Sequence, residues 1–329
     1  MRPDASFQTN FRGVLPSFIY RRLMFVTVAL ILQGCARPVL NVTPPNLPVQ
    51  PAISGVVILV SEDIPAYSKV AKELAKQLGQ RSSIQYLNGS TLENIKMLAA
   101  YKNDENKQFV SIGLNASIAA RTLIHRQVVF CQVFDYPDYE LLTSRHKGVS
   151  MMPSISKTFA VWRELAPNIT DIGVISGPGF EEMIQAARAA AKNYGITLYH
   201  ETVKSDKEYQ YAYKELADKV QGYWLLPDNR VLSGNILRDV MTFSVRNKKQ
   251  VAVFSEELLN LGGLFSTVTD PQNIAQQVLD RLEQAQQKET IPGPNIVYPD
   301  KLILTINPVM AQRLNLDVPE SYRRYEHAL

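Results

Sequence analysis

Polar side chains follow apolar runs at three points of this 329-residue chain. Asp228 and Asn229 come after an apolar run and a proline, Asp135 follows a second run, and Glu256 or Glu257 follows a third. Ionised carboxylates accept strong hydrogen bonds from ammonium groups. If the ends of these runs converge, we expect their carboxylates to bind the ammonium group of a small ligand.

A complementary site for an anion is predicted at Asn115, Ala116 and Ser117. These small or polar residues open a helical pattern near 117–123, and the first turn of a helix carries unpaired N–H groups and a partial positive charge. Such a turn can bind a carboxylate. The alternative is that Asn115 is only the N-cap residue of this helix, a role that contributes about 1 kcal/mol to helix stability.

Carboxylates on one side of a cleft and a helix start on the other predict a zwitterionic amino acid as the ligand. Tyr136 and Tyr139 are placed to wall an apolar or aromatic side chain, and Ser255 joins the candidates at the end of the third run. Two alternatives stay open. The tyrosines can be surface turn residues, and Asp228 with Asn229 can be a turn and cap pair that leads into the next helix.

The apolar runs that precede these residues are typical of buried strands, and helical patterns follow them. The clearest five are Gly55–Ser61, Phe109–Gly113, Ile172–Ser176, Tyr223–Asn229 and Val251–Ser255. Strands that alternate with helices form parallel sheets, and ligands bind beyond the carboxyl ends of such strands. We therefore expect an α/β fold of two similar Rossmann-like lobes with parallel sheets, and a ligand site at their strand ends.

The division of the chain into lobes follows from the repeated order of strands and helices, with a crossover near 146–156. The N-terminal lobe is expected to comprise residues 54–150 plus 264–290. The C-terminal lobe is expected to comprise residues 151–263 plus 291–329. Because the chain passes between the lobes several times, the connections should form a multi-strand hinge.

The first 34 residues are predicted to be a lipoprotein signal peptide. A basic pair at 21–22 precedes a ten-residue apolar core, which is too short to span a bilayer as a helix. The ending Leu32-Gln33-Gly34-Cys35 resembles the bacterial lipobox, which implies that Cys35 is lipidated and becomes the mature N-terminus. The alternatives are an ordinary signal peptide or an uncleaved anchor.

Residues 35–54 contain five prolines and almost no charge, which is typical of an extended tether. A tether of this kind lets a lipid-anchored domain stand clear of the membrane, on the periplasmic side of the envelope. Ala36, which stands after Cys35 in place of an aspartate, favours the outer membrane.

Charge and composition exclude some partners. The chain has 35 basic and 31 acidic residues, and its first 34 residues hold four arginines and one acid, so the remainder carries 31 basic and 30 acidic residues. This balance predicts no electrostatic surface for nucleic acid. The hydrophobic content of 46% is that of an ordinary globular protein.

Signals for catalysis, metal binding or a cofactor are weak. The four histidines are scattered and lack the spacing of metal ligands. Gly177-Pro178-Gly179 is not a phosphate-binding loop, because no Lys-Ser/Thr follows it and proline removes an N–H donor. Cys131 has only the lipidated Cys35 as a second mature cysteine, so we predict a buried thiol with no disulfide. We therefore expect neither an enzyme nor a cofactor.

From about residue 54 to 319 the chain resembles the substrate-binding component of ABC-type uptake systems, in the periplasmic binding protein family with a type I fold that includes tryptophan- and tyrosine-binding members. The matching stretches are Ser111–Gly113, Gly148–Ser150, Pro227–Asn229, Phe254–Glu257 with Gly262–Gly263, and Ile306–Leu316. Where such families usually show Gly-Thr-Pro-Ala, this chain has Gly113-Leu-Asn-Ala116. Their Asp-Pro appears here as Asp135-Tyr-Pro137. Both departures lie at the expected site, so the ligand of the better-known members cannot be assumed for this chain.

The resemblance implies a lipid-anchored protein that captures a small solute between two lobes and delivers it to a permease with its ATPase. An alternative function is a ligand-sensing or scaffold lipoprotein of the envelope with no transport role. The sequence leaves the identity of the solute open.

Overall fold

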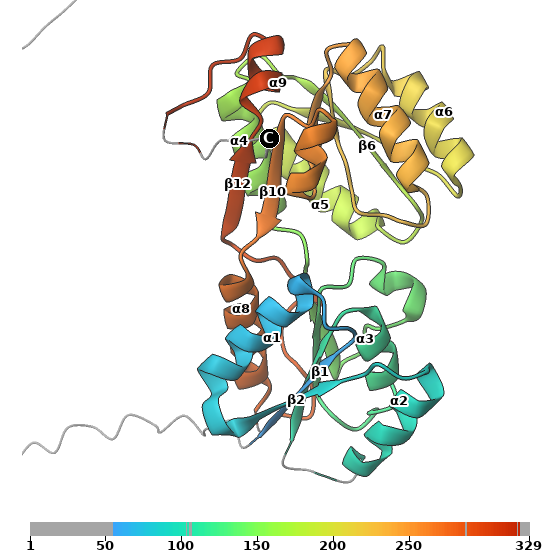
Figure 1. Cartoon of the computed structure of the whole chain (residues 1–329), viewed down its shortest axis with the longest axis vertical. Helices are drawn as coiled ribbons and strands as arrows, with labels where there is room; N and C mark the ends of the chain where they lie inside the picture. Colours follow the sequence, from blue (N-terminus) through green and yellow to red (C-terminus); the bar gives the residue numbers. More distant parts are fainter. Residues whose placement is uncertain (1–54, 103, 105–106, 287, 321, 323–329) are drawn as a thin grey trace, which may run out of the picture. The chain divides into compact units, whose positions relative to one another are not determined.

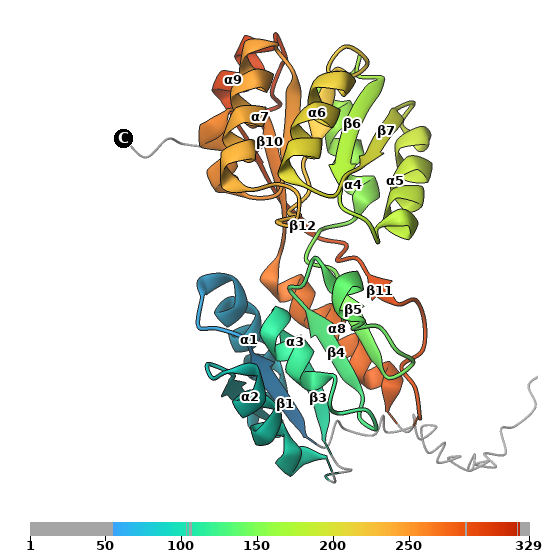
Figure 2. The ribbon, with the colours of Figure 1, turned by 90° about the vertical axis from the view of Figure 1, so that its right-hand side faces the viewer.

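The computed structural model describes residues 55–102, 104, 107–286, 288–320 and 322. The predicted signal peptide, lipidated cysteine and tether therefore lie outside the described residues. The described chain folds into two α/β lobes, each built on a six-stranded sheet (Figures 1 and 2). This confirms the predicted fold class.

The sheet of the first lobe has the order β11-β5-β4-β3-β1-β2, and all of its neighbouring strands are parallel. Its strands are β1 (Val56–Val60), β2 (Ser82–Tyr86), β3 (Gln108–Ile112), β4 (Val128–Cys131), β5 (His146–Val149) and β11 (Ile296–Val297). The α-helices of this lobe are α1 (Pro65–Leu78), α2 (Thr91–Leu98), α3 (Leu114–Ala120) and α8 (Pro271–Ala285). Its 3-10 helices are η1 (Gly79–Arg81), η2 (Ala99–Tyr101) and η3 (Tyr136–Tyr139).

The sheet of the second lobe has the order β12-β10-β9-β8-β6-β7, and it is parallel except that β12 runs antiparallel to β10. Its strands are β6 (Asp171–Ser176), β7 (Thr197–Thr202), β8 (Gly222–Trp224), β9 (Gln250–Val253), β10 (Phe265–Thr269) and β12 (Leu302–Ile306). The helices are α4 (Ile155–Leu165), α5 (Glu181–Asn193), α6 (Asp206–Leu216), α7 (Gly234–Arg246), α9 (Pro308–Arg313) and the 3-10 helix η4 (Glu256–Leu261).

Helices cover both faces of each sheet, which explains why β1 and β4 are apolar throughout. In β1 all five residues are buried. Val56, Ile58 and Val60 belong to the core cluster that includes α1 and α8, which lie side by side in Figure 1. Val57 and Leu59 belong to the cluster that includes α2 and α3.

Several helices begin at a side-chain cap. The Ser90 hydroxyl accepts the N–H of Glu93, and the Glu93 carboxylate accepts the N–H of Ser90, so α2 begins with a capping box. The Ser205 hydroxyl accepts the N–H of Glu208 at the start of α6, and the Ser233 hydroxyl accepts the N–H of Ile236 at the start of α7. These short polar residues determine where each helix starts after a strand.

Three segments join the lobes. Residues 150–154 lead from β5 to α4, Asp270 leads from β10 to α8, and residues 298–301 lead from β11 to β12. The Thr269 hydroxyl donates to the carbonyl oxygen of Met151 at 3.2 Å, which ties two of the segments together. The chain thus has the multi-strand connection expected between two lobes.

Two segments differ from the expected lobe boundaries. We expected 264–290 in the first lobe, but β10 pairs with β9 and β12 in the second sheet. Phe265 packs edge-on against Trp162, with ring centroids 5.4 Å apart, so β10 completes the apolar core of the second lobe. We also expected 291–329 in the second lobe, but Ile296–Val297 pairs with β5 of the first sheet.

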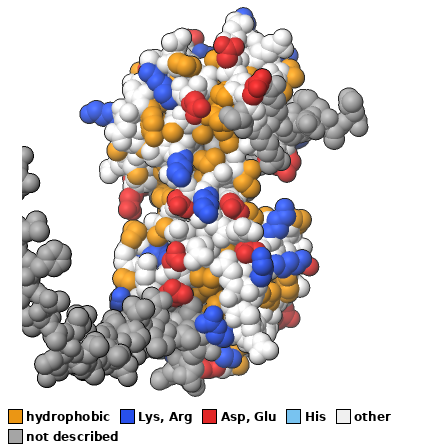
Figure 3. All heavy atoms as spheres, turned by 90° about the vertical axis from the view of Figure 1, so that its left-hand side faces the viewer, with side chains coloured by type: hydrophobic (Ala, Val, Ile, Leu, Met, Phe, Trp, Pro, Cys, Tyr) orange, Lys and Arg blue, Asp and Glu red, His pale blue; other side chains and the backbone are white. Residues whose placement is uncertain are grey.

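Acidic and basic side chains are interspersed on the face of the molecule that Figure 3 shows. Within the part of the chain that the structure describes, no helix is long and apolar enough to cross a membrane. The same residues contain no group of three or more His, Cys, Asp or Glu side chains that could hold a metal ion. Cys131 is fully buried in β4, and burial raises the pKa of its thiol to about 12.

We predict that Gly113→Ala destabilises the first lobe. Gly113 has φ +84°, and an added Cβ would lie 2.8 Å from the Ser61 hydroxyl and 2.7 Å from the Tyr67 ring. Strain at such a backbone position amounts to about 1–3 kcal/mol, which urea denaturation would measure. Gly234→Ala is the matched control, since Gly234 has open space around it and should keep or slightly raise stability. Equal denaturation midpoints for the two variants would contradict the prediction.

Candidate functional site

A cavity of about 660 Å³ lies between the lobes and is lined by both of them. We call it the large cavity. The first lobe contributes the start of α1, including Lys69, and Gln132 after β4. The second lobe contributes Trp224 at the end of β8 and the residues around the start of η4. The connecting segments supply Met151 and Met152.

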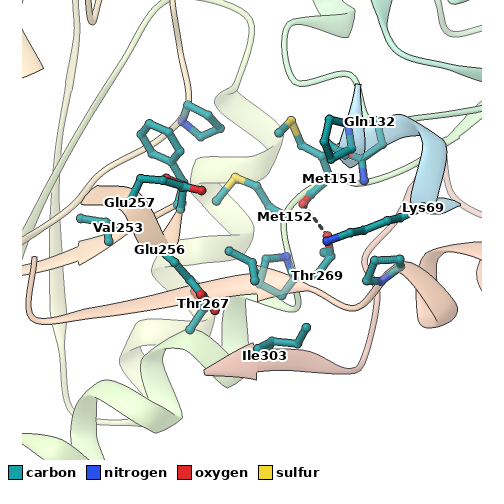
Figure 4. A pocket seen from close by; sticks show the side chains of 18 of the residues that line it. Lys69, Gln132, Met151, Met152, Val253, Glu256, Glu257, Thr267, Thr269 and Ile303 are labelled. Atoms are coloured by element: carbon teal, nitrogen blue, oxygen red, sulfur yellow. Dashed lines mark hydrogen bonds between the residues drawn. The ribbon is translucent and has the colours of Figure 1, made fainter. Parts of the chain in front are cut away.

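Figure 4 shows how the charged groups are arranged in the large cavity. Lys69 and Gln132 lie on one side of the two methionines, and Glu256 and Glu257 lie on the other. No ion pair joins Lys69 to another residue within the described ranges. The cavity thus has a basic end on the first lobe, an acidic end on the second, and apolar side chains between them.

Local structure positions these groups. Helix α1 begins at Pro65, whose fixed φ suits a helix start, so Lys69 lies one turn into the helix. Gln132 follows the last residue of β4 in a left-handed conformation, with φ 58°. The Ser150 hydroxyl accepts the N–H of Met152 at 3.0 Å and fixes the connecting segment next to the cavity.

The two glutamates at the acidic end have different partners. Glu256 accepts a hydrogen bond from the Thr305 hydroxyl at 2.8 Å. Glu257 accepts one from the Ser255 hydroxyl at 2.6 Å, and this bond together with a backbone N–H lowers the pKa of Glu257 below its ordinary value. Because the charged form is favoured, Glu257 is a carboxylate at neutral pH and can accept bonds from an ammonium group.

Among the residues predicted from sequence, Ser255, Glu256 and Glu257 line the large cavity. Asn229 lies in an exposed turn. Asp135 is half-buried and precedes η3. Neither of these two lines the large cavity.

The predicted anion site at the start of α3 also lies outside the lining of the large cavity. The N-cap residue of α3 is Gly113, so the alternative in which Asn115 caps the helix is wrong. Asn115 is exposed, and the N–H of Ala116 donates to the Ser61 hydroxyl at 2.8 Å. The Ser117 hydroxyl donates to the carbonyl oxygen of Gly113 at 2.8 Å. These polar groups bind one another within the first lobe.

Asp228 is buried, with 1% of its surface exposed, and its carboxylate already has partners. It accepts hydrogen bonds from Nε of Arg230 at 2.7 Å, from Nη2 of Arg230 at 2.8 Å and from the backbone N–H of Gly177 at 2.8 Å. Its carbonyl oxygen accepts the N–H groups of Val231 and Leu232. The structure therefore shows the turn geometry that we had considered as the alternative, and Asp228 presents no free oxygen to a ligand.

Arg230 connects this turn to the first lobe. Its Nη1 donates to both carboxylate oxygens of Asp138 at 2.8 Å and to the carbonyl oxygen of Pro178 at 3.1 Å. The guanidinium also lies over the ring of Phe180, 4.9 Å from the centroid. Hydrogen bonds to Asp228 and then to Asp138 raise the pKa of Arg230. Sequence reasoning missed this bridge, because Asp138 and Arg230 are 92 positions apart.

Tyr136, predicted as a wall of the ligand site, lies elsewhere. Its ring packs against Phe130 and Phe180, with centroid distances of 5.9 and 6.4 Å. It lines a separate cavity of about 170 Å³, which we call the small cavity. The lining of the small cavity shares no residue with that of the large cavity.

The sequence analysis also missed Lys69, Gln132 and the methionines of the large cavity. Lys69 belongs to the apolar-periodic helix after the first strand, where several lysines are candidates. A search for polar residues in the first turns after each strand would have found it.

The fold and the interlobe cavity define a two-lobed α/β binding protein. Residues 70–327 match the family model described as ABC transporter substrate binding protein, so the chain belongs to that family. It is accordingly a substrate-binding protein of an ABC transporter and not an enzyme.

Solved structures share this fold at low sequence identity. A structure of an ABC domain in complex with L-Trp from Streptococcus pneumonia has a TM-score of 0.55 at 20% identity, covering 82% of this chain and 96% of that one. The ligand-free, open structure of a substrate-binding protein with adhesive properties from Clostridium difficile has a TM-score of 0.60 at 15% identity, covering 83% and 99%. A conserved domain protein from Vibrio cholerae has a TM-score of 0.54 at 19% identity, covering 82% and 97%. None of the curated protein sequences matches the chain.

We predict different effects for the two carboxylates that bind Arg230. Asp228→Ala removes a buried partner and leaves Arg230 with one exposed ion pair, so it should destabilise the protein by about 3 kcal/mol. Asp138→Ala removes a carboxylate whose side chain is 38% exposed, and this should cost no more than about 1 kcal/mol. Urea denaturation of both variants measures the difference. Similar losses in the two variants would show that burial does not set the strength of these bonds.

Proposed function

We propose that the chain is a lipid-anchored solute-binding protein that captures a small zwitterionic amino acid in the large cavity and delivers it to an ABC-type permease. The observation that carries the proposal is the presence of Lys69 and Glu257 on opposite sides of one cavity, each contributed by a different lobe. A ligand that carries both a carboxylate and an ammonium group matches this pair of charges.

The apolar lining supports the amino-acid assignment further. Trp224, Met151 and Met152 lie in the wall of the large cavity. Methionine side chains adapt to irregular apolar groups, and tryptophan offers a large flat surface. The cavity volume of about 660 Å³ lies within the range of roughly 300–1,000 Å³ that is usual for small-molecule sites. The proposed ligand therefore has an apolar side chain between its contacts at the two ends.

This proposal moves the charged contacts away from the residues first predicted. Asp228 is bound by Arg230, and Asn115 and Ser117 lie outside the lining of the large cavity. Lys69 takes the role proposed for the helix start, and Glu257 takes the role proposed for Asp228. Lys69 is a new position, whereas Glu257 was already one of the carboxylates predicted for the ammonium group, and both residues follow strand ends.

We predict that Lys69→Met and Glu257→Gln each weaken amino-acid binding by about tenfold or more, because each removes a charge that pairs with the ligand across the cavity. Native mass spectrometry of the purified protein identifies a bound solute, and calorimetry with a panel of L-amino acids measures affinity. Lys72→Met is the matched control on α1, since Lys72 is exposed and does not line the cavity.

The pH dependence follows from Glu257. Its lowered pKa means that the carboxylate is charged above that pKa and loses its charge only as the pH falls below the usual glutamate range. Affinity for the amino acid should therefore hold from neutral to mildly acidic pH.

An affinity that is unchanged in both Lys69→Met and Glu257→Gln would refute the proposed binding mode, and a protein that binds no amino acid would favour the sensing or scaffold alternative.

We predict that Cys35→Ala abolishes lipid anchoring. The proposal rests on the lipobox-like Leu32-Gln33-Gly34-Cys35 after an apolar core, in which the Cys35 thiol accepts the lipid. Mass spectrometry of the N-terminal fragment from membrane and soluble fractions measures the attached acyl chains. Acyl chains that persist in the variant would contradict the anchor, and fractionation of the parent protein would test the outer-membrane location favoured by Ala36.

A further inference from the structure

The small cavity lies between the second lobe's α5 and the first lobe's β11, next to η3; Figure 2 shows α5 above β11. Tyr136 comes from η3, Glu182 and Met183 come from α5, and Ile296 and Tyr298 come from β11 and the segment that follows it. Segments from both lobes therefore form this site, as they form the large cavity.

Four polar side chains line the small cavity, namely those of Tyr136, Glu182, Asn295 and Tyr298, and Glu182 is exposed to solvent. Burial raises the pKa of the Tyr136 hydroxyl and of the Tyr298 hydroxyl, and the negative charge of Glu182 raises both further. The two phenols are therefore neutral, and the charge at this site is the one carboxylate. Within the described part of the chain, no hydrogen bond or ion pair engages the Tyr136 hydroxyl, the Tyr298 hydroxyl or the Glu182 carboxylate.

The remaining surface of the small cavity is largely apolar. Leu142, Met183, Ala186 and Ile296 form part of its lining. The ring of Tyr136 is held edge-on to Phe180 at 6.4 Å, so its position at the cavity is fixed by packing. The lining of the small cavity therefore combines the ring of Tyr136, an apolar surface and one charged group, the unpaired carboxylate of Glu182.

This set of groups favours one kind of ligand. Neither lysine nor arginine is present in the lining, so an anion would meet the charge of Glu182 with nothing to offset it. A cation with apolar substituents would satisfy the carboxylate, contact the aromatic rings and cover the apolar floor. The volume of about 170 Å³ is below the usual range for drug-sized ligands, which limits the ligand to a few non-hydrogen atoms.

We propose that the small cavity is a second binding site, specific for a small organic ammonium ion, in which Glu182 neutralises the charge and Tyr136 and Tyr298 contact the substituents on nitrogen. The site is separate from the amino-acid site proposed in the large cavity, because the two linings have no residue in common. An ammonium ion bound there touches both lobes and the segment that connects β11 to β12.

Choline chloride is the probe, titrated into the purified protein by calorimetry with sodium chloride at equal ionic strength as the blank. We expect saturable binding to the parent protein. Glu182→Gln and Tyr298→Leu should each weaken it at least about fivefold, since one removes the charge and the other removes the ring. Tyr298→Phe keeps the ring and should bind choline nearly as well as the parent. Glu215→Gln, an equal change of charge at an exposed position of α6, should leave binding unchanged.

Three outcomes would overturn the proposal. The first is an absence of saturable binding at concentrations up to tens of millimolar. The second is an affinity for choline that Glu182→Gln leaves within twofold of the parent. The third is a loss of choline binding in Glu257→Gln together with its retention in Glu182→Gln, because the cation would then lie in the large cavity. Thermal melts of each variant confirm that it is folded, and Glu182→Gln and Tyr298→Phe change only polar atoms.

Discussion

A carboxylate that is almost fully removed from water needs a cationic partner, and Asp228 has one in Arg230. Two hydrogen bonds from the guanidinium of Arg230, one from its backbone N–H and one from Gly177 hold the carboxylate in the turn that follows β8. The same bonds fix the guanidinium, whose remaining edge reaches Asp138 of the first lobe. The buried ion pair between Asp228 and Arg230 therefore positions the guanidinium group that binds Asp138 of the first lobe.

The bond to Asp138 has a different character, because it is partly exposed to water. Ion pairs of this kind contribute about 0–1 kcal/mol, so the contact favours one arrangement of the lobes without fixing it. The aromatic contact of Tyr136 with Phe180 adds apolar area beside it. A weak polar bond next to a small apolar contact suits a binding protein whose lobes must admit and release a ligand.

The two cavities between the lobes differ in chemistry because different segments form them. The large cavity has Lys69 and Glu257 on opposite sides, and on this we base the proposal of a ligand with two opposite charges. The small cavity has one carboxylate beside aromatic rings, and on this we base the proposal of a cation. The similar solved structures share the fold at 15–20% identity, and at that level the lining of each cavity has to be interpreted from this chain's own residues.

The parts of the structure that depend on local patterns can be predicted from the amino-acid sequence. Apolar runs bounded by polar residues predicted the two α/β lobes, and the run Ile172–Ser176 lies in β6, which begins one residue earlier at Asp171. The rule that ligands bind beyond strand ends identified Ser255 and Glu256 as cavity residues. Strands, helices and the polar residues at strand ends depend on burial and hydrogen bonding within short segments, and the pattern of neighbouring residues indicates both.

Which polar groups line a cavity and which bind one another depends on contacts between segments that are distant in the sequence. The sequence suggests that Asp228 can accept a hydrogen bond from a ligand. In the folded chain, however, Asp228 accepts hydrogen bonds from Arg230, and Arg230 also donates to Asp138. Lys69 lines the large cavity because the other lobe lies opposite its helix, a fact that no local pattern contains. Strand β10 likewise joins the second sheet, where Phe265 completes the apolar core. The physical reason is the same in each case. A charged or apolar side chain is stabilised by contacts with residues that are distant in the sequence, and the fold of the whole chain determines which residues these are.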